Sequence, residues 1–175
     1  EQSVSQWAST FAEAGLGVSK TLGDLAGPVL FATFMGISRT IYARSSAQWN
    51  INRSLYLNAG FGIVAYLVTS LSPIPWLAFV GSAVVGFCVG IMWPGTLTLA
   101  SEMIPRGGTA LFALLALAGD VGCSLGPYVV GLFTEGAADN LSKGILVATI
   151  FPILIFLAMA YLRRRKKRSD IRPLP

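Results

Sequence analysis

The chain has 175 residues, of which 54% are apolar and only 12% are charged, with a mean hydropathy of +0.66 and a net charge of +5. Soluble domains carry about 25% charged residues, so the composition predicts a membrane protein without a separate soluble domain. Histidine is absent and the two cysteines are isolated. This excludes the usual zinc, copper and haem ligand sets and His-dependent nucleophiles, so we expect no cofactor, no metal and no enzyme activity.

The chain opens at Glu1 with a semi-polar helical pattern and without the basic and apolar regions of a signal peptide. We interpret it as a chain cut inside a helix. A span needs about 20 apolar residues, and backbone in lipid must form helices because water is absent. The predicted fold class is therefore all-α, a polytopic transmembrane helical bundle. Its expected helices are 1–15 (partial), 20–42, 54–72, 76–101, 108–134 and 143–162, followed by a basic cytoplasmic tail at 163–175.

The positive charge is concentrated in one block, residues 163–168, directly after an apolar run. Such a block is typical of a cytoplasmic stop after a span, with anionic lipid headgroups as a second interpretation, and we expect no nucleic-acid partner. Of the thirteen Lys and Arg residues, only Lys20 and Lys143 fall in the opposite set of loops. This asymmetry predicts an inside carboxy terminus.

The first helix carries a polar stripe that includes Gln2, Ser5 and Gln6. Neutral donors and acceptors of this kind bind hydroxyl-rich molecules without fixed charge. Trp7 and Trp93 are candidates to stack on an apolar sugar face, although packing is an equal alternative for both. These five residues are the predicted substrate-binding set.

Asp120 lies about midway along the predicted fifth span, where an ionised carboxylate costs several kcal/mol unless it is paired, hydrated or protonated. We therefore expect it to face a bundle interior or a water-filled path, in a coupling or substrate role or in a structural hydrogen bond. Asp24 follows Lys20 by four residues, so an ion pair at the membrane edge is its alternative to a pathway role. Glu1 joins Asp24 and Asp120 in the predicted proton-coupling or polar pathway.

Glycines recur in the predicted fourth and fifth spans, with GxxxG spacings at Gly86 to Gly90 and Gly122 to Gly126. Such spacings allow helix backbones to approach closely. Tight packing is one interpretation. The other is that smooth glycine faces, with breaks at Pro94 and Pro127, permit the bending of alternating access.

Three segments together resemble the major facilitator superfamily. The basic loop after Gly36, with Arg39 and Arg44, is similar to the family's glycine and arginine loop, although the acidic residue usual there is missing. The run 102–107 resembles its Glu, Pro and Arg-Gly signature, and the run 119–131 resembles its glycine-proline helix eleven. Across nearly the whole chain the pattern looks like helices seven to twelve, with helix seven truncated at its start.

The resemblance implies half of a twelve-helix transporter, built from two inverted three-helix repeats, that works by alternating access. It implies that Glu102 and Arg106 serve inner-side gating, together with Arg39. The expected partners are a small-molecule substrate, the lipid bilayer and the missing amino-terminal half. We expect secondary active transport, as in a symporter, or facilitative transport of a sugar or similar small polar metabolite. The expected location is a bacterial inner (plasma) membrane.

Two other function classes remain open. A receptor or assembly subunit could keep the bundle without transport, and the same bundle also serves exporters of drug-like compounds. An intramembrane enzyme is disfavoured by the missing histidine and metal ligands, although an acid pair of Asp24 and Asp120 is formally possible.

Overall fold

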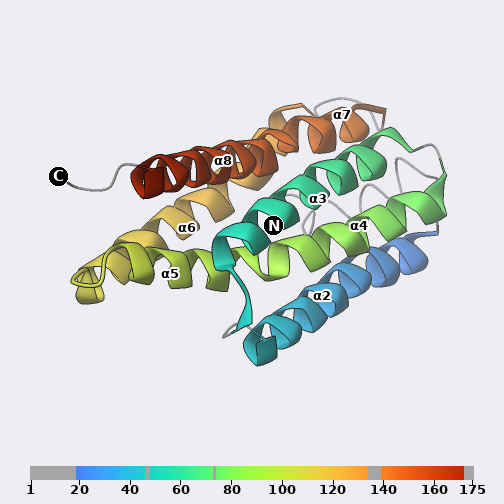
Figure 1. The fold of residues 1–175 in the computed structure, drawn as a ribbon. Coiled ribbons are helices and arrows are strands. Elements are labelled where there is room, and N and C mark those ends of the chain that lie inside the picture. Colours follow the sequence, from blue (N-terminus) through green and yellow to red (C-terminus); the bar gives the residue numbers. More distant parts are fainter. Residues whose placement is uncertain (1–18, 46–47, 73, 134–138, 172–175) are drawn as a thin grey trace.

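The computed structural model describes residues 19–45, 48–72, 74–133 and 139–171, and the elements in that part are all helices (Figure 1). They are α2 (Lys20–Ser45), α3 (Ile51–Leu71), α4 (Pro75–Gly90), α5 (Met92–Met103), α6 (Gly108–Leu132), α7 (Asp139–Ala148) and α8 (Ile150–Ile171). The predicted all-α bundle is confirmed. The predicted helix 1–15 lies outside the described residues.

Four stretches of the described chain are long and apolar enough to cross a membrane: Ile51–Leu71, Trp76–Met103, Gly108–Leu132 and Lys143–Arg165. They correspond to the third to sixth predicted spans. Helix α2 has 26 residues, which is also long enough, but Arg39 and Arg44 make its second half less apolar.

The outer surface of the bundle is rich in apolar side chains. Large hydrophobic residues are exposed on helices from α2 to α8, for example Val29, Phe61, Val80, Leu114 and Leu157. Soluble monomers rarely expose apolar surface on this scale, because it is costly to hydrate. The surface is therefore suited to lipid, and the chain is an integral membrane protein.

Two of the predicted spans are each divided into two helices by a proline. Pro94 and Pro152 are the third residues of α5 and α8, and each lacks the N–H that would bond to the carbonyl four residues earlier. The helical hydrogen bonds resume one residue later, with Gly95 N donating to Ile91 O at 2.9 Å and Ile153 N donating to Thr149 O at 3.3 Å. The predicted break at Pro127 is absent, because α6 continues through that residue.

Helix α4 packs against α2 on one side and α3 on the other. Its glycines allow this approach, since a Cβ built on Gly90 would lie 2.7 Å from the carbonyl oxygen of Met35 in α2. A Cβ on Gly86 would overlap the carbonyl of Phe31, one turn earlier in α2. The α2–α4 interface therefore agrees with the tight-packing interpretation of these two glycines.

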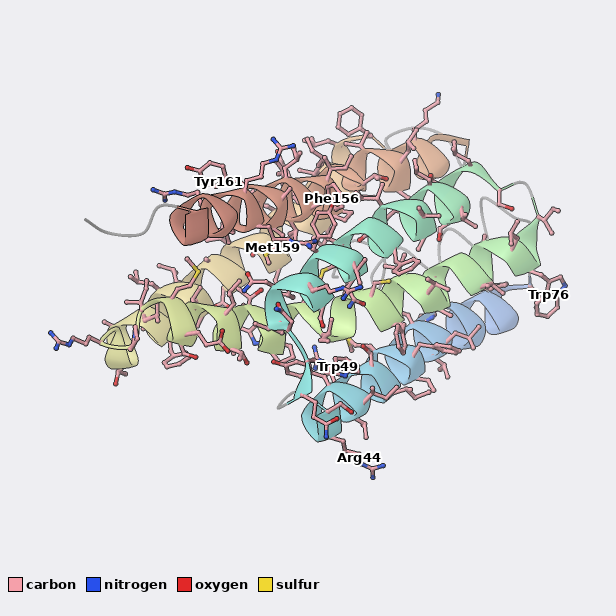
Figure 2. All side chains as sticks on the ribbon, viewed as in Figure 1. Arg44, Trp49, Trp76, Phe156, Met159 and Tyr161 are labelled. Atoms are coloured by element: carbon pink, nitrogen blue, oxygen red, sulfur yellow. The ribbon has the colours of Figure 1, made fainter. Side chains whose placement is uncertain are left out.

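Charged and aromatic residues mark the two ends of the bundle. Figure 2 shows Arg44 and Trp49 at one end and Trp76 at the opposite end. The start of α3 and the ends of α2, α5 and α8 lie on the left in Figure 1. Near these helix ends the sequence carries Arg53 in the first turn of α3, Arg106 after α5, and Arg163 to Arg165 late in α8. The fold thus gathers these basic side chains on one side of the predicted membrane.

Candidate solute pathway

The structure describes part of the predicted site. Glu1, Gln2, Ser5, Gln6 and Trp7 lie outside the described residues, as does the side chain of Asp24. The predicted residues whose side chains are described are Trp93, Asp120, Arg39, Glu102 and Arg106. The polar stripe of the first helix therefore remains a prediction.

The position of Trp93 follows from the interruption of the helix at Pro94. Because the helical hydrogen bonds are interrupted between α4 and α5, Trp93 lies in the first turn of a helix that starts at Met92. Its side chain is 40% exposed, so it is a ring on a surface and not a core residue. Thr96, three residues later, is also exposed, with its hydroxyl donating to Met92 O at 2.6 Å. Trp93 and Thr96 give α5 one exposed, partly polar face.

The indole ring of Trp93 lies against the backbone of α6. A Cβ built on Gly119 would be 2.9 Å from Cη2 and 3.0 Å from Cζ3 of that ring. Only the missing side chain of Gly119 lets the ring lie so close. The fold thus brings Trp93 beside the residue that precedes Asp120, so two candidates from different predicted spans lie near each other in the described bundle.

Asp120 lies at the midpoint of α6 and is exposed. Ser124, one turn later, is exposed too, and its hydroxyl donates to the backbone oxygen of Asp120 at 3.1 Å. Within the described part of the chain the Asp120 carboxylate has no hydrogen bond or ion pair. The described helices therefore do not enclose Asp120, although we expected it to face a bundle interior or an aqueous path.

The three predicted gating residues are exposed and lie at the basic end of the bundle. Glu102 and Arg106 form no ion pair among the described residues, although only the α5 end and a short turn separate them. Helices α2 and α5 run in the same direction (Figure 1), and the hydroxyls of Tyr42 and Thr98 meet at 2.9 Å. Arg39 and Glu102 lie on opposite sides of that contact, roughly 10 Å apart along the helix axes.

The Tyr42 to Thr98 contact is a feature that sequence reasoning missed. Thr98 Oγ1 donates its single hydrogen to Pro94 O at 3.0 Å, so Tyr42 is the donor in their shared bond. The pair ties α2 to α5 one turn beyond the proline break. A threonine four residues after an intramembrane proline was the available signal, since such a hydroxyl commonly bonds the carbonyl of its own helix.

The glycines of α6 differ from those of α4. A Cβ built on Gly122 would meet nothing within 4 Å, and Gly126 is buried. Helix α6 contacts mainly α7, with a smaller contact to α5. Helix α6 is thus open on the side of Gly122 and, as the exposure of Asp120 and Ser124 shows, on the side of Asp120 as well.

Autophagy-related protein 22 of Yarrowia lipolytica is similar to the chain, with 34% identity over 112 residues. The alignment covers 61% of this chain and 19% of that protein, so the chain spans about a fifth of the length of its relative. No protein-family model and no solved structure matches the chain. The bundle fits the fold that the major facilitator resemblance implies, and the half-transporter division stays a prediction. A yeast relative gives no support to the expected bacterial membrane.

Proposed function

We propose that the chain forms one wall of a secondary transporter for a small polar solute, and that the exposed face of α5 and α6 lines the pathway. The observation that carries the proposal is Asp120, a carboxylate at the midpoint of an apolar helix whose central stretch is not buried by the described bundle. A charged side chain in hydrocarbon costs about 2.5–3.5 kcal/mol or more. A second protein wall with water between the two removes that cost.

The exposed face of α5 and α6 suits a neutral polar solute. Trp93 offers an exposed aromatic ring for an apolar sugar face, and Thr96 and Ser124 offer hydroxyls. The proline break beside Trp93 is a point where α5 can bend relative to α4 without losing a further hydrogen bond. Bending at this point would move Trp93 and change access to the face, as alternating access requires.

The partner wall belongs to the same proposal. The chain covers a fifth of its relative, which leaves ample sequence in that protein for the missing amino-terminal half. The concentration of arginines at one end supports a cytoplasmic carboxy terminus. We place the protein in a eukaryotic internal or surface membrane, because the relative comes from a yeast.

The test uses the intact protein in proteoliposomes. A thermal-shift screen with glucose, leucine and citrate first identifies the solute class, and uptake of the radiolabelled hit follows. For Asp120→Asn we expect uptake driven by a proton gradient to fall by about ten-fold or more, because an amide cannot carry a proton. Exchange of solute between the two sides, which needs no net proton movement, should be retained.

Asp139→Asn is the matched control, since it makes the same chemical change at the start of α7. It should leave both uptake and exchange unchanged. Equal gradient-driven uptake by Asp120→Asn and the parent protein would rule out the coupling role. Loss of both activities with unchanged thermal stability would instead assign Asp120 to solute binding.

A receptor or assembly subunit is the second candidate, and the name of the relative, which refers to autophagy, favours it. This candidate predicts no thermal shift with any of the three solutes and no uptake. It also predicts that Asp120→Asn leaves association with partner proteins intact.

A further inference from the structure

The basic end of the bundle contains a side-chain arrangement that the proposed transport does not use. Arg163 of α8 places its guanidinium over the ring of Tyr56 of α3, with Cζ 4.7 Å from the ring centroid. The same Tyr56 ring stacks on Phe156 of α8, with centroids 4.4 Å apart and an interplanar angle of 29°. Phe156, Tyr56 and Arg163 therefore form a ladder between two helices.

This ladder is anchored in the bundle. Figure 2 shows Phe156 on the side of α8 that faces α3, and a Cβ on Gly60 of α3 would lie 3.5 Å from the Phe156 ring. Tyr56 and Leu162 pack against a buried cluster that includes Leu55 and Met159. Two packed rings thus fix the position of a guanidinium that is itself exposed.

The guanidinium lies at the predicted membrane surface. The last apolar residue of the candidate span that contains most of α8 is Leu162, directly before Arg163, and the candidate span of α3 begins at Ile51. Arg53 is exposed one helical turn, about 5 Å along the axis, before Tyr56. Among the described residues, neither Arg53 nor Arg163 is paired with a carboxylate. Two guanidinium groups at the headgroup level thus have their donors available.

We propose that Arg163, held by Tyr56, binds together with Arg53 the phosphate of an anionic phospholipid in the adjacent leaflet. A guanidinium donates two parallel hydrogen bonds to phosphate oxygens, and stacking on a ring leaves its edge free for them. The exposed apolar side chains Leu57 and Phe61 continue along α3 from this point and provide a surface for the acyl chain. A soluble phosphate would gain nothing from that apolar surface.

The experiment measures phosphatidylserine bound to the intact, detergent-purified protein by native mass spectrometry. For Arg163→Gln we expect the dissociation constant to rise about five-fold, which corresponds to about 1 kcal/mol. Arg44→Gln removes the same charge at the same end of the bundle, from α2, and should change it less than about two-fold. Equal effects of the two substitutions would overturn the site in favour of diffuse attraction to the basic end.

Tyr56 provides a second comparison. Tyr56→Phe keeps the ring and should bind phosphatidylserine as the parent does, whereas Tyr56→Leu removes the ring and should weaken binding. Equal binding by the two variants would show that the ladder does not position Arg163. Thermal unfolding of each variant checks the fold, and Arg163→Gln keeps the proposal testable if Tyr56→Leu fails to fold.

Two further titrations identify the ligand. Phosphatidylcholine should not show the dependence on Arg163, because its headgroup is neutral overall. Inorganic phosphate should compete only weakly with phosphatidylserine. Competition at equal concentration would assign the site to a soluble phosphate and overturn the lipid proposal. None of these outcomes depends on transport activity, so the lipid site and the transporter proposal can fail separately.

Discussion

Helices α4 and α6 are both apolar and rich in glycine, yet α4 is buried in the bundle and α6 is exposed. In the span that contains α4, 61% of the most apolar 18-residue stretch is buried, whereas in α6 the corresponding share is 0%. The space beside Gly86 and Gly90 of α4, where a side chain would lie, is occupied by the backbone of α2, whereas the space beside Gly122 of α6 is open. Apolar character and GxxxG spacing therefore do not decide where a membrane helix lies.

The two helices also differ in how far their central polar residues are buried. Ser82, the hydroxyl residue in the middle of α4, is buried, whereas α6 carries an exposed carboxylate at its midpoint. Among the described residues the Ser82 hydroxyl has no hydrogen-bond partner, and burying such a group costs about 1–3 kcal/mol. An ionised carboxylate in hydrocarbon costs about 2.5–3.5 kcal/mol or more unless water or a partner reaches it. Helix α4 is thus packed within the described bundle, whereas α6 meets a second surface only in the function proposed above.

The largest expected effect is that of Gly86→Ala. The added methyl group overlaps the backbone carbonyl of Phe31, which cannot turn aside as a side chain can. We expect the free energy of unfolding to fall by about 3 kcal/mol, the upper end of the range for overpacking. The higher helix propensity of alanine, about 1 kcal/mol, is too small to offset this. Unfolding in mixed detergent micelles gives the value, and a change below 1 kcal/mol would contradict a close α2–α4 contact.

Gly119→Ala should have a smaller effect on stability and a clear local one. The methyl group meets the Trp93 ring at 2.9 Å, but an exposed ring can rotate away, so we expect the free energy of unfolding to change by less than about 1 kcal/mol. The emission of Trp93 should shift as the ring moves. Introducing Gly119→Ala into a Trp93→Phe background should remove the shift, and a shift that persists there would place the contact elsewhere.

The fold class was predictable because lipid leaves backbone few choices. Long apolar runs separated by prolines and charges predicted the bounds of α6 to within two residues, since polar residues stand in the sequence before its start and after its end. The division at Ile91 was predictable from Pro94. The division at Thr149 follows from Pro152 by the same argument, but the apolar run around it concealed the break.

The candidate site was less predictable, because it depends on which helices are neighbours. Sequence reasoning selected Trp93 and Asp120 separately, from aromatic character and from the cost of a buried charge. The contact of Trp93 with Gly119, the residue before Asp120, requires the α5–α6 packing, which no local pattern encodes. The Tyr56 to Arg163 ladder was missed for the same reason, since it joins residues more than 100 positions apart.

Gly122→Ala has the smallest expected effect and tests the comparison most directly. The added methyl group meets nothing within 4 Å, so in the isolated chain the substitution should raise the free energy of unfolding by up to about 1 kcal/mol through helix propensity alone. In the intact protein the sign should reverse if a second wall packs on α6, because the methyl group would then enter a close interface. Unfolding of both proteins, with and without the substitution, measures the difference. The same stabilisation in both would mean that the Gly122 side of α6 faces lipid, and the second wall would then have to approach from the Asp120 side alone.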